Sequence, residues 1–407
     1  MRKLNEVCKN ANLVFFLFCK TIYKQIINSY NTDMYDFIIV GAGLFGCVLA
    51  NELKRIGSVC VFEKEDHIGG TCYTEERNGI TIHKNGAHIF RTNDKEIYEY
   101  ISKFCEMIPY THYVIAKRGN KSYCLPFGMG LFSQYFNTND VKKIERRMKI
   151  KPRKDPKNLE EKVIGMIGKD LYKAFVKEYT EKQWGRKCKD LPPSVIDGIP
   201  FRKNFDYSYF NEVYQCVPKN GYTEIMEKML DGVTVFTNVD FDRTKEVYKD
   251  KAKVIIHTGM IDKYFDYSLG KLEYRSLKFV EKEYDEEIKT CAAVVNYVTK
   301  KEKYTRSIEH KLFDKFCSSN KTIVTYEYPM SYIEGVNTPY YPINDDKNNA
   351  LYEKYKNLAK DEGIVFAGRL GGYEYNQMST TIERALRLAD KIKRDVRQLT
   401  RSCQGIF

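Results

Sequence analysis

The feature that most constrains the fold of this chain is a glycine-rich turn between two short apolar runs. The first run is DFIIV at residues 36–40, the turn spans residues 41–46, and residues 44–56 have helical periodicity. A second apolar run, VCVF, follows at residues 59–62. A strand, a tight turn, a helix and a second strand in this order form a βαβ unit, which predicts a Rossmann-like domain.

The three glycines of the turn each have a separate role in such a unit. Gly41 allows the tight turn, Gly43 lets the backbone approach a pyrophosphate, and Gly46 lets the helix pack closely on the strand. The helix begins with Leu44 and Phe45. The backbone N–H groups at this N-terminal end have no partner within the helix, and such groups favour a bound phosphate. The turn is therefore expected to bind a dinucleotide.

The residues after the second apolar run favour FAD over NAD. Glu63 lies 20 residues after Gly43, where a carboxylate can accept the ribose hydroxyls. A glycine pair, Gly69 and Gly70, follows it, and this order resembles the two-dinucleotide-type flavoproteins. Near the C-terminus, FAGRL at residues 366–370 supplies Arg369, which in that family reaches the flavin pyrophosphate.

The rest of the chain divides by its periodicity. Residues 96–179 are mostly helical in pattern, whereas residues 272–280, 292–298 and 322–328 alternate with the two-residue period of half-buried antiparallel strands. Residues 364–367 and a helical segment from 379 return to the first domain. We expect an α/β fold with three parts: a discontinuous FAD-binding domain (34–112, 215–262 and 343–407), a helical domain (113–178) and an antiparallel sheet domain for the substrate (179–214 and 263–342).

Charge and composition narrow the classes of partner. The net charge of +13 suits a phosphorylated substrate as well as a polyanion, and the densest basic run, residues 142–154, has no interleaved aromatic residues. It is therefore interpreted as a solvated helix face, with no nucleic-acid partner. No C-x-x-C or H-x-x-x-H spacing is present, so no metal site is expected. Free thiols indicate a reducing compartment, which predicts a cytoplasmic protein.

Residues 1–33 precede the first strand and contain one apolar run, LVFFLFC at 13–19. Seven residues are too few to cross a bilayer, which needs about 20. No small-residue cleavage site follows the run, so it does not have the pattern of a secretory signal. We expect an N-terminal extension without stable membrane insertion.

The middle of the chain is similar to UDP-galactopyranose mutase at several separated strings. They keep the order of the family from residue 34 onward: HKNGAHIF (83–90), YTEKQWG (179–185), LEYRSLKF (272–279), YTR (304–306), PYYP (339–342), GRL (368–370) and residues 373–378. The resemblance implies an isomerase that interconverts UDP-galactopyranose and UDP-galactofuranose. It also implies reduced FAD, whose N5 atom forms a covalent adduct with the sugar, a UDP-sugar as partner, and no catalytic carboxylate pair. A homodimer is compatible with it.

The same resemblance carries over a set of site residues. Phe175, Tyr179 and Trp184 match the uridine pocket, with Tyr179 stacked on the uracil, although a core aromatic stripe is the ordinary interpretation of such spacing. Arg306 matches the diphosphate arginine, and Arg275 is a second cation on a predicted strand. The other matches to the substrate site are Tyr209, Asn296, Tyr341 and Tyr375, and those to the cofactor site are Thr71, His88 and Met378.

Several positions depart from the pattern of the family. Gly198 stands where mutases usually have an arginine on a mobile loop, and Arg186 or Arg202 could compensate for its charge. Arg91 stands where they have a histidine beside the flavin and sugar. Smaller departures are Gly128 and Thr71 for asparagines and Gln377 for an acidic residue. Three alternatives follow: a mutase for another nucleotide sugar such as UDP-N-acetylgalactosamine, a degenerate protein that binds FAD and a sugar nucleotide, and an FAD-dependent oxidase or desaturase.

Overall fold

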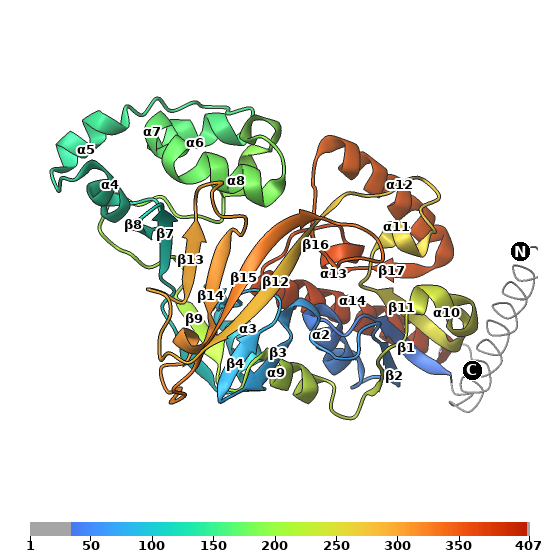
Figure 1. Ribbon diagram of the computed structural model, residues 1–407. Helices are drawn as coiled ribbons and strands as arrows, with labels where there is room; N and C mark the ends of the chain where they lie inside the picture. Colours follow the sequence, from blue (N-terminus) through green and yellow to red (C-terminus); the bar gives the residue numbers. More distant parts are fainter. Residues whose placement is uncertain (1–33, 405–407) are drawn as a thin grey trace, which may run out of the picture.

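The computed structural model describes residues 34–404, so the predicted N-terminal extension lies outside the described residues (Figure 1). A five-stranded parallel sheet forms the first domain, in the order β10-β2-β1-β11-β17. Its strands are β1 (Tyr35–Val40), β2 (Val59–Phe62), β10 (Thr234–Phe236), β11 (Ala252–His257) and β17 (Ile364–Phe366). The Rossmann-like architecture and its assembly from separate chain segments are confirmed.

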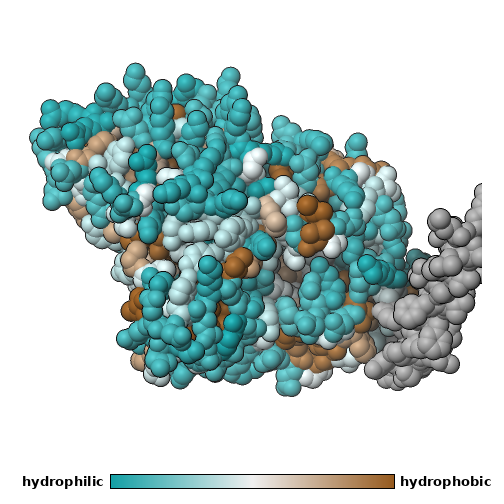
Figure 2. Space-filling model, in the orientation of Figure 1, coloured by the Kyte–Doolittle hydropathy of each residue, from teal (hydrophilic) through white to brown (hydrophobic). Residues whose placement is uncertain are grey.

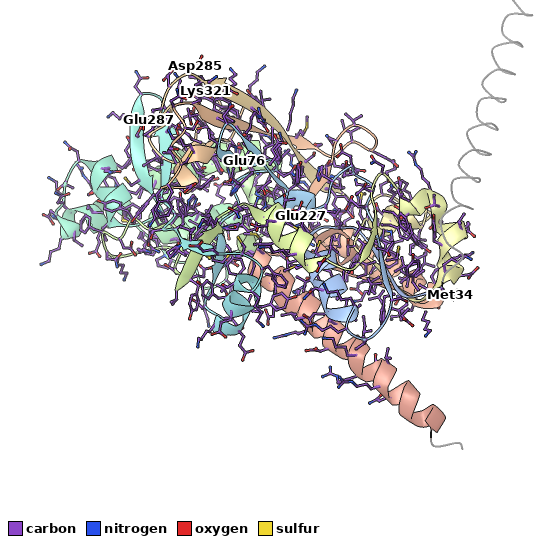
Figure 3. The ribbon with its side chains drawn as sticks, turned by 90° about the horizontal axis from the view of Figure 1, so that it is seen from below. Met34, Glu76, Glu227, Asp285, Glu287 and Lys321 are labelled. Atoms are coloured by element: carbon purple, nitrogen blue, oxygen red, sulfur yellow. The ribbon has the colours of Figure 1, made fainter. Side chains whose placement is uncertain are left out.

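Both faces of this parallel sheet are covered, which explains its continuous apolar runs. Helix α2 (Leu44–Leu53) is buried along its whole length and packs against α14 (Met378–Gln404). Figure 3, seen from below, shows α14 beside α2, with the far half of α14 extending past the body of the protein. On the opposite face, Ile38 and Phe62 pack against α10 (Phe241–Tyr248) through Phe241.

A seven-stranded sheet forms the centre of the molecule, in the order β16-β12-β15-β14-β13-β7-β8 (Figure 1). Its strands are β7 (Val114–Arg118), β8 (Lys121–Leu125), β12 (Tyr274–Tyr284), β13 (Val294–Tyr297), β14 (Arg306–Glu309), β15 (Thr322–Ser331) and β16 (Pro339–Pro342). The three strands predicted from alternation are present as β12, β13 and β15. The sheet is mixed rather than fully antiparallel, because β13 pairs with β7 in parallel.

The predicted helical domain differs from the structure at both ends. Residues 114–125 form the β7–β8 hairpin and join the sheet, because Val114, Ala116 and Leu125 alternate inward and are buried. Within the helical pattern of residues 96–179, the helix α6 (Leu159–Ile167) ends at Gly168, which has a φ of 83°. It resumes through a π-helical segment, Tyr172–Val176, into α8 (Lys177–Trp184). Residues 185–213, predicted as part of the sheet domain, contain short 3-10 turns and loops instead of sheet strands.

The remaining elements connect these layers. They are β3 (Thr74–Arg77) with β4 (Ile80–His83), the three-stranded sheet of β5 (Phe90–Thr92), β9 (Tyr214–Pro218) and β6 (Met107–Pro109), and the helices α3 (Lys95–Ser102), α4 (Met129–Phe136), α5 (Val141–Met148), α7 (Lys169–Leu171), α9 (Tyr222–Met229), α11 (Ile261–Tyr264), α12 (Asp346–Glu362) and α13 (Gly368–Gly371). Within residues 34–404, no helix is both long and apolar enough to cross a membrane.

The first half of the basic run at 142–154 lies on α5, whose Ile144 and Met148 are buried while its lysines and arginines face solvent; residues 149–154 follow as a mostly exposed loop. In Figure 2 the outer surface of the region that contains α4–α8 is predominantly hydrophilic. This arrangement agrees with the interpretation of the run as a solvated helix face.

Candidate functional site

The glycine turn after β1 brings backbone atoms into close contact. Gly41 has a φ of 103°, and a Cβ there would lie 2.1 Å from the Thr258 hydroxyl. A Cβ at Gly46 would lie 2.0 Å from the Gly41 carbonyl oxygen. At Gly43 the nearest protein atom, the Gly70 Cα, would be 4.0 Å away, so this position alone of the three has room for a further group. The turn therefore leaves room for a ligand at Gly43 and at the start of α2, where Leu44 and Phe45 lie.

The second glycine pair lies directly against this turn. The Gly69 N–H donates to the Ala42 carbonyl at 2.8 Å, and a Cβ on Gly70 would come within 3.1 Å of the Gly43 Cα. The Glu63 carboxylate accepts from the Ala42 N–H at 2.8 Å and is 5% exposed. The turn at 41–46, the loop at 69–70 and Glu63 at the end of β2 thus lie together. Glu63 holds the turn through the Ala42 N–H, and its carboxylate oxygens can accept further hydrogen bonds beside it.

The remaining predicted cofactor residues come from four other elements. Thr71 lies in a short 3-10 turn, Gly70–Cys72, and Met378 begins α14. Arg369, on α13, donates to the Asn376 carbonyl at 3.2 Å. The His88 Nδ1 lies 2.7 Å from the Gly86 carbonyl, and burial lowers the pKa of this imidazole to about 4 in spite of that contact, with the charge of Arg369 acting in the same direction.

Arg306 is the centre of a cluster on one face of the seven-stranded sheet. It pairs in register with Asn296 on β13 and with Glu327 on β15, so the three side chains form a row across adjacent strands. Its guanidinium donates to the Tyr179 hydroxyl at 3.1 Å, and its Nε lies 3.6 Å from a Glu327 oxygen. Burial opposes its charge, but Glu327 and the nearby phenols of Tyr179 and Tyr341 raise its pKa well above the ordinary value.

Two polar atoms of this row make no hydrogen bond to the described residues. They are the Arg306 Nε and the Asn296 Oδ1, both buried. Buried polar atoms are normally hydrogen-bonded, so atoms left free on one face of a sheet indicate a surface prepared for a ligand. Glu327 itself is 1% exposed and accepts from the Thr305 hydroxyl at 3.3 Å.

Three predicted tyrosines lie around Arg306. The rings of Tyr341 and Tyr375 are 5.3 Å apart, and the Arg369 guanidinium lies 5.5 Å from the Tyr375 ring centre. Burial raises the pKa of Tyr209 to about 12; the phenol of Tyr179 acts in the same direction, while Arg306 and Arg91 oppose it. Tyr375 is 60% exposed, so the phenols form one wall from the buried row to the surface.

Arg91, on β5, is not a free cation. It forms an ion pair with Glu212, and its guanidinium lies 4.0 Å from the centre of the Phe210 ring. The His112 ring stacks on Phe210 with the ring centres 5.2 Å apart. Burial lowers the pKa of His112 to about 3, and the charges of Arg306 and Arg91 lower it further. The position thus forms a packed wall of the site.

Three further predicted substrate residues have other neighbours. Phe175 is 3% exposed and packs edge-on against Tyr123 and Tyr135, which is the core role that its spacing also allowed. Trp184 and Arg275 line a cavity beyond the end of α8. Arg275 donates to the Gln183 carbonyl and the Ser331 hydroxyl, whereas Arg306 donates to the Tyr179 hydroxyl.

The two arginines expected to compensate for Gly198 are both engaged elsewhere. Arg186 forms ion pairs with Glu273 and Asp345, each at 2.8 Å. Arg202 is 8% exposed and holds the loop at 206–211 together through the Ser208 and Phe210 carbonyls and the Asn211 amide. Gly198 has no atom within 4 Å of an added Cβ, so a side chain there would be accommodated.

Sequence reasoning missed Glu327, Glu212 and His112. Glu327 was detectable in principle, since it occupies an inward position of an alternating strand where a charge needs a partner. Glu212 and His112 gave no local signal, because they reach the site from loops that flank the cluster. Among the described residues, no group of three His, Cys, Asp or Glu is placed to hold a metal ion.

Comparisons with known proteins agree with this geometry. A family model described as UDP-galactopyranose mutase matches residues 174–375, and a model described as an NAD(P)-binding Rossmann-like domain matches residues 39–105. A probable UDP-galactopyranose mutase of Klebsiella pneumoniae is 36% identical over 88% of this chain and 94% of that protein. A dTDP-fucopyranose mutase of Escherichia coli is 32% identical over 88% of this chain and 98% of that protein.

The fold is also similar to that of a solved structure. The crystal structure of a reduced UDP-galactopyranose mutase superposes with a TM-score of 0.69 at 13% identity, over 88% of this chain and 93% of that one. At this identity the superposition supports the architecture, while the relatives of higher identity bear on the family.

Proposed function

Because the chain belongs to the UDP-galactopyranose mutase family, whose named members are isomerases, we propose that it interconverts UDP-galactopyranose and UDP-galactofuranose with bound, reduced FAD. The observation that carries this proposal is the row of Asn296, Arg306 and Glu327, in which the buried Arg306 Nε and the buried Asn296 Oδ1 have no hydrogen-bond partner among the described residues. An oxidase or desaturase has no need of such a diphosphate-binding group.

The glycine turn fits FAD. Gly43 faces open space, and the loop at 69–70 lies against it, so a pyrophosphate can approach both backbones. We assign FAD binding to this turn, Glu63, Thr71, His88, Arg369 and Met378. When bound, reduced FAD supplies the nucleophilic nitrogen that exchanges with UDP at the anomeric carbon of the sugar.

The protein has to stabilise the departing diphosphate. Arg306 keeps its charge when water is excluded, and its planar fork matches phosphate oxygens. The Glu327 carboxylate lies 3.6 Å from the Nε as a counter-charge, and the Tyr179 hydroxyl accepts a hydrogen bond from one terminal nitrogen. A group that is already oriented loses little entropy when charge develops on the leaving group. The hydroxyls of Tyr341 and Tyr375 are assigned the remaining diphosphate oxygens.

Neither Arg186 nor Arg202 is free to replace the arginine missing at position 198. Arg186 and Arg202 hold structural contacts, and position 198 is a glycine, so stabilisation falls mainly on Arg306. One charge-assisted contact contributes about 1.5 to 3 kcal/mol. We therefore expect slower turnover than in a mutase with two free arginines, and a protein that binds the nucleotide sugar without turnover is the limiting case.

Arg91 favours a second substrate. A guanidinium at the sugar wall offers donors to a carbonyl oxygen, as in the acetamido group of UDP-N-acetylgalactosamine. The ion pair with Glu212 holds it on Phe210, where it can present its remaining N–H groups in one direction. The similarity to a dTDP-fucopyranose mutase also supports testing more than one nucleotide and sugar.

We place the protein in the cytoplasm. Nine cysteines of the described part are free, and burial raises the pKa of the Cys60 and Cys216 thiols to about 12. Thiols of this kind are unreactive and suit a reducing compartment. A UDP-sugar is the proposed partner, and a homodimer is proposed as the working assembly, which sedimentation would test.

The deciding experiment is to incubate the purified protein with UDP-galactopyranose and dithionite and to separate the products by chromatography. Formation of UDP-galactofuranose only with reductant supports the proposal. If the protein retains FAD but forms no furanose from UDP-galactose, UDP-N-acetylgalactosamine or dTDP-fucose, the mutase proposal is rejected. The protein would then be one that binds FAD and a nucleotide sugar without turnover.

A further inference from the structure

The loop that joins β13 and β14 connects two residues of the candidate site. Asn296 lies one residue before the end of β13, and Arg306 is the first residue of β14. In Figure 1 this loop passes beside α8, the helix that carries Tyr179. Because Arg306 donates to the Tyr179 hydroxyl at 3.1 Å, the position of the loop against α8 determines how these two side chains meet.

Lys182 holds this loop to α8 through a single ammonium group. Its Nζ lies 2.8 to 3.0 Å from four backbone carbonyl oxygens of the connection between the two strands. They belong to Tyr297, Thr299, Glu302 and Tyr304. An ammonium has three N–H donors, so four acceptors occupy all of them. Hydrogen bonds from a charged donor are roughly twice as strong as neutral ones, so this group is a strong link between helix and loop.

Two further contacts join the same surfaces. The Lys300 N–H donates to the Glu178 carboxylate at 2.7 Å, and the Lys300 Nζ donates to Glu181 at 2.9 Å. Residues 178, 181 and 182 lie on one side of α8, because they are three and four positions apart. The Lys300 side chain is 57% exposed, and an exposed ion pair contributes little. Most of the attachment therefore depends on Lys182.

The charge of Lys182 is unfavourable for packing alone. Burial lowers the pKa of Lys182 to about 8, although the charges of Glu302 and Glu178 act in the opposite direction. An apolar side chain would fill the same place without the loss of hydration that an ammonium suffers. What the ammonium adds is a common donor for four carbonyls of an irregular loop, which it draws together beside α8.

We propose that Lys182 is a positioning residue of the diphosphate site, because by holding the β13–β14 loop on α8 it sets the Arg306 guanidinium against the Tyr179 hydroxyl. A guanidinium that is already oriented loses less entropy when it meets a diphosphate. Lys182 itself does not touch the substrate in this role. The inference rests on the proposed function for the task of Arg306, and it adds a residue that acts through Arg306.

The first test is Lys182→Met, which keeps an unbranched side chain and removes the charge. The full-length protein with bound FAD is compared with its parent for UDP affinity by calorimetry and for turnover of UDP-galactopyranose. We expect UDP affinity to be several-fold weaker and kcat to be about tenfold lower, with unchanged FAD content. Lys177→Met is the matched control. The Lys177 side chain is exposed on the same helix, so both quantities should keep their parental values.

A double substitution separates positioning from a general effect on stability. If Lys182 acts through Arg306, Lys182→Met should weaken UDP binding in the parent but change it little in Arg306→Ala. A merely structural role would give the same fold-change in both backgrounds. Thermal unfolding and FAD content check that the variants fold. Lys182→Gln, which keeps two N–H donors without the charge, replaces Lys182→Met where the latter is unstable.

The pH dependence of UDP affinity provides a second readout. The charged groups that face Lys182 are Glu178 and Glu181 of α8 and Glu302 and Lys300 of the loop. Because the pKa of Lys182 is lowered to about 8, the ammonium loses its proton above this pH and the four carbonyls lose their charged donor. The UDP affinity of the parent should therefore fall between about pH 7 and 9.5, whereas Lys182→Arg, which stays charged, should show a smaller fall.

Three results would overturn the inference. They are equal UDP affinity and turnover in Lys182→Met and the parent, equal fold-changes in the parent and Arg306→Ala backgrounds, and an equal fall with pH in Lys182→Arg and the parent. A parent protein that binds UDP but forms no furanose would reject the proposed reaction alone, because the comparison of affinities still decides the role of Lys182. A parent that does not bind UDP would reject both.

Discussion

The glycine turn and the Arg306 cluster solve the problem of binding phosphate in opposite ways. The turn uses backbone atoms from residues 41–70, closed by contacts such as that of Gly46 with the Gly41 carbonyl, and it leaves open space at Gly43. The cluster uses charged and phenolic side chains from α8, β14, β15 and β16. The first site depends on the absence of side chains, and the second depends on their charge.

The two regions therefore differ in how many buried side-chain polar atoms they leave without a hydrogen bond. Residues 34–70 contain none of the buried unpartnered side-chain polar atoms found among the described residues, whereas the row across β13 and β14 contains two. Backbone N–H groups at a helix end can be hydrogen-bonded to water until a ligand binds. A guanidinium removed from water is destabilising unless a counter-charge such as Glu327 lies beside it. A site built from side chains thus carries its own electrostatic support.

The largest effect is expected at the glycine turn. Leucine at Gly43 should leave the fold intact and abolish FAD binding, because its side chain fills the open space, whereas leucine at Gly46 should also lower the melting temperature, because its Cβ would meet a carbonyl oxygen at 2.0 Å. Flavin absorbance per protein and thermal unfolding measure the two effects. A Gly43→Leu protein with a full complement of FAD would refute the assignment of this turn.

At the cluster, Arg306→Ala should lower turnover by about ten- to more than a hundredfold while FAD content stays unchanged. The loss combines a missing contact to the diphosphate with an unpaired Glu327. Arg186→Gln is the matched control, since its charge is already paired, and it should keep most of the turnover. Equal losses in the two variants would mean that Arg186 does replace the cation missing at position 198.

The difference between the two regions also decides what the sequence could predict. The turn lies within one βαβ unit, so its strands, helix and glycine roles follow from local periodicity. The cluster depends on strand register, and Glu327 meets Arg306 only because β14 and β15 pair as they do. No local pattern specifies that pairing, and Arg306 was found through the resemblance of its string to the mutase family.

The errors have the same origin. The β7–β8 hairpin was assigned to the helical domain because nothing in its local sequence shows that it joins a sheet. It does so by pairing with β13, which lies about 180 residues further along the chain. The helical pattern of residues 96–179 likewise gives no sign of the π-helical segment Tyr172–Val176 or of the break at Gly168. Local spacing cannot include such interruptions.

A smaller effect is expected in the pH dependence of the unfolding free energy, through a buried histidine beside the Arg306 cluster. His112 is buried and neutral with its pKa lowered to about 3, against about 6.5 in the unfolded chain. Its contribution to stability is therefore present above pH 6.5 and is lost as the pH falls towards 3. Between pH 7 and 5, His112→Phe should reduce the loss of unfolding free energy by roughly 1 to 2 kcal/mol, measured by urea titration. An unchanged pH dependence would show that His112 is not buried in its neutral form. His88 on the cofactor side, whose pKa is lowered to about 4, can be substituted in the same way for comparison.

The smallest effect concerns the choice of sugar at Arg91. In the acetamido interpretation, Arg91→His lowers turnover of UDP-N-acetylgalactosamine several-fold and keeps that of UDP-galactose, because histidine offers fewer donors to the carbonyl. In the diphosphate interpretation, both rates fall together. The ion pair adds a second arm: Glu212→Gln weakens the restraint that holds the guanidinium on Phe210, so it should reduce selectivity between the two sugars without removing the charge. If neither variant changes the ratio of the two kcat/KM values, Arg91 serves only to pack Phe210 and His112, and the sugar is selected elsewhere.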